Sequence, residues 1–428
     1  MREFCRRWVI VLLAAFLLLS TGGKAKAQQH AFTQYQIDQD IVEVPFEYMD
    51  HQILVHADTP TKKGMTFLFD TGATAPVLDR SLSQLGQFLA TTRIKEADGE
   101  TTGEEVVLDD LEMGDRNGKV SAHNIEALVM DLSHLSKALQ RKLDGIIGIS
   151  FLAGYVTEID YTAHVLRFYN PQNYTITTRK PDGQRTFMLD LIPGDLTRPD
   201  STLLVAGQLH PKYDYSFLLD TGFGGYISVA QSAAVESGLL KPDTPRVEVT
   251  NFGVSRAFRS DKIRAAYLTL GPLNLTGRIV QVDVRNGNKY GQNGIVGNRL
   301  LQNYRVTLDY PRRKLWLEQV TDKQEPDAAE KPSFGLQVRA DGVRLRVEHV
   351  DHASPGQQSG IRPGDCILSI NGDTLRTLTP LQAQHLISTP HGAITLVLQR
   401  GVDPNLGTGG DTYTLTLTPA APVDWTTR

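Results

Sequence analysis

Short stretches in which apolar and polar residues alternate recur along most of this chain, beginning with residues 41–55. This period-two alternation, rich in β-branched residues, is typical of half-buried strands. Helical patterns are few and short, and the clearest cover residues 131–142, 230–239 and 380–387. The last of these has Thr379 as its expected N-cap and Pro380 at its first position. The pattern therefore predicts a mostly β protein.

Two of the apolar runs end in the same tripeptide. Residues 67–72 read FLFDTG and residues 217–222 read FLLDTG, and a strand-like stretch follows each copy. Gly148 ends a GIIG run 78 residues after Asp70, and Gly297 ends a GIVG run 77 residues after Asp220. An Asp-Tyr pair comes next in both copies, at residues 160–161 and 309–310. One Asp-Thr-Gly alone is consistent with an ordinary turn, but this matched order indicates an internal repeat.

The doubled aspartate has a direct chemical meaning. Two facing carboxylates that share one proton provide a general base and a general acid at one point, which a single carboxylate cannot do. Asp70 and Asp220 are therefore the candidate catalytic pair. Of the other acids near the motifs, Asp79 is expected to cap a short turn, and Asp160 and Asp309 fall inside strand patterns with structural roles.

The N-terminus has the pattern of a targeting segment. Basic residues precede an apolar run at residues 8–19, and residues 25–27 read AKA, so we predict a signal peptide over residues 1–27. The run is too short to span a bilayer, and no membrane span is expected after cleavage. Only Cys366 remains in the mature chain, so no intrachain disulfide can form. We expect an exported protein of a bacterial envelope, periplasmic or secreted.

The remaining composition excludes several classes of function. The formal net charge is −4 and no basic run is present, so no nucleic-acid partner is expected. The chain has no zinc-protease, serine-hydrolase or phosphate-loop motif, and we expect no metal and no cofactor.

Two changes in composition divide the chain. A polar passage at residues 175–185 separates the repeats, which predicts a first lobe over residues 28–178 and a second over residues 179–319. Residues 320–332 are charged, punctuated by proline and almost free of large apolar side chains, as in a linker. A further unit follows over residues 333–420.

Over about 280 residues, the paired Asp-Thr-Gly and apolar-apolar-Gly motifs resemble the pepsin and retropepsin families of aspartic proteases. The separation of 150 residues between Asp70 and Asp220 is similar to two fused retropepsin-sized units, as in bacterial retropepsin-like proteins. The resemblance implies a bilobal fold of two β-barrel-like lobes related by a pseudo-twofold axis. It also implies that the two aspartates face each other across a cleft and activate water to hydrolyse a peptide or protein substrate.

The same resemblance assigns supporting roles to the residues around the pair. The matching positions are Thr71, Gly72, Thr221, Gly222, Gly148 and Gly297. The threonines would brace the two loops through hydroxyl hydrogen bonds to the opposite backbone. The glycines that follow them would allow close backbone approach, and the two later glycines would support the loops from beneath.

The position after each Asp-Thr-Gly departs from the pepsin pattern, because Ala73 and Phe223 stand where a hydroxyl usually donates to the carboxylate. Losing such a donor raises a carboxyl pKa, so we expect a pair that works at mildly acidic to neutral pH. The Phe223 ring could also narrow the cleft or take the place of the water. A catalytically inactive, protease-like peptide-binding protein, with the unit at residues 333–420 as a scaffold arm, therefore stays open as an alternative function.

Further substrate-binding candidates lie in two predicted flaps. Residues 97–103 and 251–254 contain Gly99 and Gly253, which suit the tips of hairpins that open and close over a substrate. Ala73 and Phe223 are candidates as well, because they flank the catalytic pair.

The last unit resembles the PDZ domain of bacterial envelope proteases. Phe334, Gly335 and Leu336 match the loop whose backbone N–H groups receive the terminal carboxylate of a peptide. By this resemblance, a peptide C-terminus or another extended strand would lie beside residues 337–338, against the helix predicted at residues 380–387.

Overall fold

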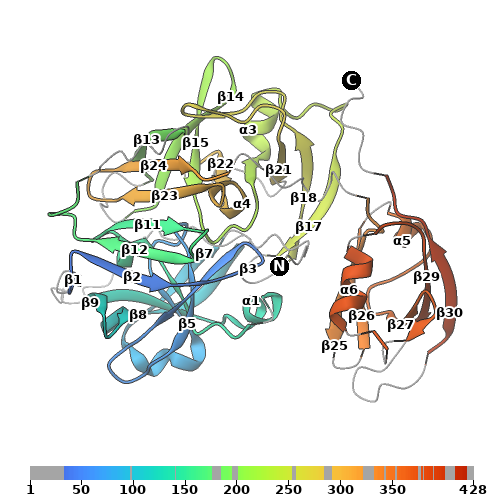
Figure 1. Ribbon diagram of the computed structural model, residues 1–428, viewed down its shortest axis with the longest axis horizontal. Helices are drawn as coiled ribbons and strands as arrows, with labels where there is room; N and C mark the ends of the chain where they lie inside the picture. Colours follow the sequence, from blue (N-terminus) through green and yellow to red (C-terminus); the bar gives the residue numbers. More distant parts are fainter. Residues whose placement is uncertain are drawn as a thin grey trace. The chain divides into compact units, whose positions relative to one another are not determined.

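The computed structural model describes residues 33–96, 99–139, 141–175, 185–194, 201–252, 257–283, 292–321, 332–341, 344–351, 354–374, 377–378, 380–388, 390–400 and 410–421. The fold is mostly β, as predicted, with few and short helices (Figure 1). Residues 325–428 belong to one compact unit, called here the C-terminal unit, and both copies of the repeat belong to the other apart from residues 245–250, which are grouped with the first. No helix in the described ranges has the length and apolarity that crossing a bilayer requires.

The first copy of the repeat forms lobe 1, which we define as the elements β1 to β12. Its strands are β1 (Gln34–Ile37), β2 (Ile41–Pro45), β3 (Glu47–Met49), β4 (Gln52–Ala57), β5 (Met65–Phe69), β6 (Val77–Asp79), β7 (Gln87–Glu96), β8 (Gly99–Asp115), β9 (Gly118–Met130), β10 (Gly145–Ile147), β11 (Val156–Asp160) and β12 (Val165–Tyr169). Its helices are the 3-10 helix η1 (Arg80–Leu85), α1 (Ser133–Ala138) and α2 (Ile149–Leu152).

The second copy forms lobe 2, the elements β13 to β24. Its strands are β13 (Thr186–Pro193), β14 (Leu203–His210), β15 (Tyr213–Leu219), β16 (Ile227–Ala230), β17 (Val247–Phe252), β18 (Ala257–Arg264), β19 (Thr269–Leu270), β20 (Leu273–Asn274), β21 (Ile279–Asp283), β22 (Gly294–Val296), β23 (Tyr304–Asp309) and β24 (Lys314–Gln319). Its helices are α3 (Gln231–Glu236) and α4 (Asn298–Leu301).

The two lobes repeat one pattern of strand pairing. In lobe 1, β10 runs parallel to β5 and antiparallel to β6, and β6 runs parallel to β9. In lobe 2, β22 runs parallel to β15 and antiparallel to β16, and β16 runs parallel to β21. The internal repeat that the sequence indicates is therefore also a repeat of topology.

Glycine at the start of β10 and of β22 makes room for an aromatic core. A Cβ on Gly145 would lie 2.2 Å from Cε1 of Phe67, and one on Gly294 would lie 2.5 Å from Cδ1 of Phe217. Both phenylalanines are fully buried in the strands that lead to the aspartates. The position of each Asp-Thr-Gly loop is thus set by a strand that lies within the hydrophobic core of its lobe.

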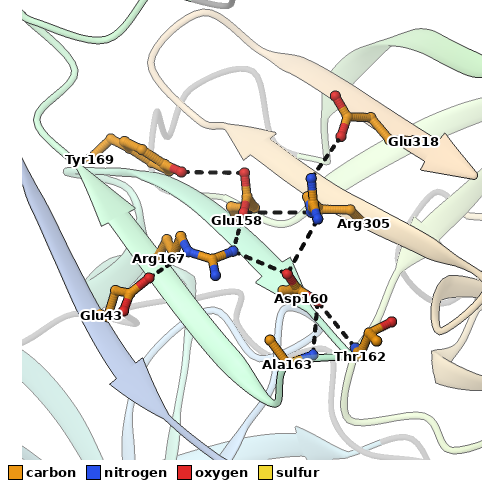
Figure 2. Close-up of polar contacts among 9 residues, drawn as sticks. All are labelled: Glu43, Glu158, Asp160, Thr162, Ala163, Arg167, Tyr169, Arg305 and Glu318. Carbon is orange, nitrogen blue, oxygen red and sulfur yellow. Dashed lines mark hydrogen bonds and ion pairs between the residues drawn. The ribbon is translucent and has the colours of Figure 1, made fainter. Parts of the chain in front are cut away.

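A continuous sheet joins the lobes through the strand order β13-β24-β23-β11-β12-β2. The contact between halves is the antiparallel pair β11–β23, in which Ile159 lies opposite Val306. One face of this sheet holds a network of two arginines and four acids (Figure 2). Its members are Arg167, Arg305, Glu43, Glu158, Asp160 and Glu318. Because Arg305 of lobe 2 pairs with two acids of lobe 1, the network holds the halves together.

The C-terminal unit is a small sheet with two helices and its own core. Its strands are β25 (Leu336–Asp341), β26 (Arg344–Val350), β27 (Cys366–Ile370), β28 (Asp373–Thr374), β29 (Ile394–Gln399) and β30 (Thr412–Leu417). Its helices are α5 (Pro355–Gln358) and α6 (Pro380–Ser388). The strand order β25-β26-β27-β29-β30 places β25 at an edge, and α6 packs beside it.

The helices in the two lobes are shorter than the sequence pattern predicts. The pattern over residues 131–142 gives only α1, because the N–H of Asp144 bonds to Thr66 O and draws the chain into the sheet. The pattern over residues 230–239 gives only α3, since Ala230 pairs with β21 and Gly238 ends the helix with a positive φ of 74°. The C-terminal helix starts at Pro380 as expected, and Thr379 lies outside the described residues.

Candidate active site

The two loops that carry the aspartates meet at one buried point. Asp70 follows β5 and Asp220 follows β15, and their backbone N–H groups donate to Ile147 O and Val296 O, each at 3.0 Å. Both aspartates are 0% exposed. Their carboxyl groups interact directly with each other. The structure thus brings together the two acids that the repeat singles out.

The threonines join the loops symmetrically. The hydroxyl of Thr71 donates to Leu219 O, and the hydroxyl of Thr221 donates to Phe69 O, both at 2.8 Å. Each hydroxyl also accepts from the backbone N–H of the other threonine at 3.0 Å. Because all four bonds cross between lobes and are buried, they fix one lobe's loop against the other.

The four supporting glycines are required by close contacts. A Cβ on Gly72 would lie 2.5 Å from Cγ of Asp220, and one on Gly222 would lie 2.5 Å from Cγ of Asp70. Each of these glycines therefore packs on the aspartate of the opposite lobe. A Cβ on Gly148 or Gly297 would come within 2.5 Å of a backbone oxygen of the loop above it. Any larger residue at these positions would separate the loops or the carboxyl groups.

Burial dominates the electrostatics of the pair. It raises the pKa of Asp70 and of Asp220 above the usual carboxyl range, and the charge of Asp70 raises that of Asp220 further. Backbone dipoles oppose this effect, because the N–H groups of Gly72 and Ala73 donate to Asp70 Oδ1 at 2.7 and 3.2 Å. The N–H of Gly222 lowers the pKa of both carboxyls. The site therefore favours one proton shared between two acids.

Ala73 and Phe223 flank the pair without donating side-chain hydrogen bonds. Both are buried, and the N–H groups of Ala73 and Phe223 close their loops onto Asp70 O and Asp220 O. The Phe223 ring packs on the backbone of lobe 2, because a Cβ on Gly225 would lie 2.2 Å from its Cζ. Neither residue therefore offers a side-chain donor to the neighbouring carboxyl, as the sequence suggests.

The predicted flaps coincide with hairpins. Gly99 opens β8 and pairs with Glu96 of β7, and residues 97–98 between them lie outside the described residues. The second candidate falls between β17 and β18, which are neighbours in the sheet, and Gly253 itself lies outside the described residues. The roles of Gly99 and Gly253 in substrate binding stay predictions.

Three residues at this site escaped the sequence analysis. Asn298, at the start of α4, bonds to the backbone of both lobes, and Tyr161 and His51 of lobe 1 contact it. A comparison of the two repeats could have found the first, since Asn298 follows Gly297 where Ile149 follows Gly148.

In the candidate carboxylate-binding loop of the C-terminal unit, a neighbouring side chain already bonds to the backbone. Gly335 has a φ of +68° and its N–H donates to the hydroxyl of Ser333 at 2.9 Å. Phe334 and Leu336 on either side are buried. On the edge strand β25, the carbonyl of Val338 accepts a bond of 3.1 Å from Nε2 of Gln384 on α6.

Within the described part of the chain, no group of three or more His, Cys, Asp or Glu side chains is placed to hold a metal ion. The two carboxyls at the centre of the site lie among backbone N–H groups and apolar side chains. This arrangement suits proton transfer between acids and a water molecule.

Two parts of the chain match models of known protein families. Residues 58–151 match the family model described as aspartyl protease, and residues 325–399 match the model of the PDZ domain. The chain therefore contains an aspartyl-protease domain and a PDZ domain. Among solved structures it is similar to the aspartic proteinase from Irpex lacteus, at 11% identity and a TM-score of 0.40. That likeness covers 67% of this chain and 100% of the other. A search of curated proteins found no match.

Proposed function

We propose that this protein is an exported aspartic endopeptidase, periplasmic or secreted, whose PDZ domain binds the C-termini or extended strands of substrates or partners. The observation that carries the proposal is that Asp70 and Asp220, from equivalent points of the repeat, are both buried and each pack on the glycine of the opposite Asp-Thr-Gly loop. Four threonine hydrogen bonds hold the two loops together. Loops with a purely structural role would not need two buried acids held next to each other by these bonds. Export is supported by the N-terminal sequence alone.

The reaction follows from one proton shared by two acids. The charged carboxylate takes a proton from water as the water oxygen attacks the scissile carbonyl carbon, and the neutral carboxylic acid gives its proton to the carbonyl oxygen. Collapse of the tetrahedral intermediate returns a proton from the hydroxyl to one carboxylate and releases the amine, which takes up the other proton. Asp70 and Asp220 end with one proton between them, as they began.

Substrate entry requires a movement of the protein, because both aspartates are fully buried. We propose that the long β7–β8 hairpin, whose strands pair from Gln87 to Gly99, supplies this movement as a flap. Such a flap would admit the peptide when open and exclude water when closed.

Replacing one aspartate tests the proposal. Wild-type protein and the Asp70→Asn variant are incubated with a mixed peptide library at several pH values, and cleavage products are identified by mass spectrometry. We expect internal cleavage by the wild type and its loss in the variant, which still binds intact peptides in a fluorescence anisotropy assay. Binding without cleavage by the wild type at every pH would overturn the proposal and favour a peptide-binding protein.

A further inference from the structure

The two lobes differ at one position that matters for the dyad. Gly148 and Gly297 are each followed by a residue whose N–H bonds to the loop above, Ile149 to Ala73 O and Asn298 to Phe223 O, both at 2.8 Å. Ile149 has no side-chain hydrogen-bonding group. Asn298 has an amide, and it is 0% exposed.

Both ends of the Asn298 side-chain amide are hydrogen-bonded. Nδ2 donates to Thr221 O at 2.5 Å and to His51 O at 2.8 Å, and Oδ1 accepts from the hydroxyl of Tyr161 at 2.6 Å. Two carbonyl acceptors and one hydroxyl donor determine which end of the amide faces which group, because the opposite orientation would set Oδ1 against two oxygens. Asn298 thus links lobe 1 to the catalytic loop of lobe 2.

One of these bonds ends on a peptide unit of the active site. The Thr221 carbonyl belongs to the same planar peptide as the Gly222 N–H. Gly222 packs on the dyad, because a Cβ on it would lie 2.5 Å from Cγ of Asp70, and its N–H favours the charged forms of both carboxyls. A donor on the carbonyl of a peptide fixes the plane and strengthens its N–H as a donor. The route from Tyr161 through Asn298 and this peptide therefore leads to the dyad.

Resting on the proposed protease function, we propose that Asn298 is a positioning residue, which holds the Thr221–Gly222 peptide so that its N–H faces the paired aspartates. Tyr161 orients the Asn298 amide. This role compensates for Phe223, which has no side-chain donor to offer Asp220. In both lobes the N–H groups of the glycine and of the residue after it favour the charged carboxylate: those of Gly72 and Ala73 act on Asp70, and those of Gly222 and Phe223 act on Asp220.

The repeat supplies a matched control. Tyr310 occupies the position in lobe 2 that Tyr161 occupies in lobe 1, each directly after the aspartate of the Asp-Tyr pair. The Tyr310 hydroxyl is buried and has no hydrogen-bond partner among the described residues. Tyr161→Phe breaks a link of the route, whereas Tyr310→Phe removes a hydroxyl for which the described residues supply no hydrogen-bond partner.

Other titratable groups pack around Asn298 and the dyad. Tyr48 lies on β3 and His51 on the turn between β3 and β4, Arg299 follows Asn298 on α4, and Tyr310 lies near Asp70. Burial lowers the pKa of His51 to about 4, so His51 also contributes to the pH dependence of stability. The test therefore also needs a variant in which the two aspartates cannot ionise, while His51 and the other titratable groups are unchanged.

The test is a stability cycle over pH, measured by urea unfolding of the full chain. Asn298→Leu and Tyr161→Phe are compared with wild type between pH 5 and 8, and again in an Asp70→Asn/Asp220→Asn background. Weaker support of the charged dyad raises its folded-state pKa further. A carboxyl with a raised folded-state pKa makes the folded protein less stable as pH rises. The loss in the free energy of unfolding of each variant, relative to wild type, should therefore grow with pH. In the double-Asn background the deficit should become constant, and Tyr310→Phe should show no pH-dependent deficit in either background.

The kinetic expectation is that Asn298→Leu moves the acid limb of kcat/KM upward by about one pH unit. A deficit that is constant with pH in the wild-type background would overturn the positioning role. A deficit whose growth with pH persists in the double-Asn background would also overturn it, because another group would be responsible. Should Asn298→Leu fail to fold, the pair Tyr161→Phe and Tyr310→Phe decides alone. A wild type that cleaves nothing would refute the proposed protease and leave this stability test intact.

Discussion

Asp70 and Asp220 differ in how the protein supports their charge. Two backbone N–H groups donate to Asp70 Oδ1, whereas neither oxygen of Asp220 has a partner of regular hydrogen-bond geometry among the described residues. The pKa of both is raised, chiefly by burial. The sequence suggests that missing side-chain donors raise these pKa values. Burial, which is seen only in the folded structure, raises them more.

The raised pKa values predict how cleavage depends on pH. The general base must be charged, so activity rises as pH increases through the lower pKa of the pair, which burial shifts upward. We expect a kcat/KM optimum at mildly acidic to neutral pH, and an acid limb that Ala73→Ser moves to lower pH by adding a hydroxyl donor beside Asp70. A pH–rate profile of one cleaved peptide measures both. A wild-type optimum near pH 2–3 would contradict this explanation.

Among the elements, the edge strand β25 packs beside helix α6, and two backbone groups to which a peptide would bind are already bonded. An added peptide strand would donate to the Val338 carbonyl, which Gln384 now occupies, and a terminal carboxylate would accept from Gly335, whose N–H is bonded to Ser333. The side chains of Ser333 and Gln384 therefore compete with a peptide ligand for hydrogen bonds to the backbone of the domain.

Removing the competing amide should strengthen peptide binding. We expect Gln384→Ala to bind C-terminal peptides about three- to tenfold more tightly than wild type, since one hydrogen bond no longer has to be exchanged. The measurement uses the full chain, a displayed library of random C-terminal heptapeptides and amidated copies of the best binders. Gln382→Ala, on the exposed side of the same helix, is the control. Equal or weaker binding by Gln384→Ala, or binding that ignores amidation, would refute the competition.

The paired strands β11 and β23 make the network of Figure 2 a second link between lobes. Arg167 bonds to Glu43, Glu158 and Asp160 at 2.7, 2.6 and 3.1 Å, and its side chain is only 23% exposed. The pKa of Asp160 lies below its usual value despite burial, because backbone N–H groups and Arg167 stabilise the charge. A depressed carboxyl pKa stabilises the fold above the unfolded pKa, and this stability is lost as pH falls.

Loss of Arg167 should destabilise the joined lobes. Arg167→Met leaves several partly buried acids facing Arg305 alone, and we expect a cost of about 1–3 kcal/mol in the free energy of unfolding. Arg141→Met removes a solvent-exposed pair with Glu47 and should cost under ~1 kcal/mol. Urea denaturation at neutral pH compares the two. Equal effects of the two variants would show that the network between the lobes adds nothing beyond a surface pair.

Across the whole molecule, local sequence patterns predicted local structure well, but they did not predict the contacts between the two lobes. The Asp-Thr-Gly loops, the mostly β fold and the starts of α3 and α6 follow from strand alternation, glycine and proline, which act within a few residues. Asp79 caps η1 through its bond to Ser81, as expected of an aspartate before a short turn. The ends of α1 and α3 were missed because tertiary hydrogen bonds and sheet pairing terminate them.

Contacts between distant segments could not be read from the chain. The pairing of β11 with β23, and the bonds of Asn298 to His51 and Thr221, join residues separated by many strands. No local periodicity specifies such partners. The repeat itself was the one long-range signal, because equal spacing places Asp70 and Asp220 at equivalent points of similar lobes. The signal peptide at residues 1–27 and export fall outside the described residues and stay predictions.

The central claim is that Asp70 and Asp220 act as one catalytic pair, and Asp220 is the member with the less familiar neighbour, Phe223. Its most direct test is the rate of peptide cleavage by Asp220→Asn, with Asp214→Asn, an exposed acid on the same strand, as the control. We predict that Asp220→Asn lowers kcat/KM by at least about a thousandfold and that Asp214→Asn leaves it near wild type. Cleavage by Asp220→Asn at the wild-type rate would contradict the account.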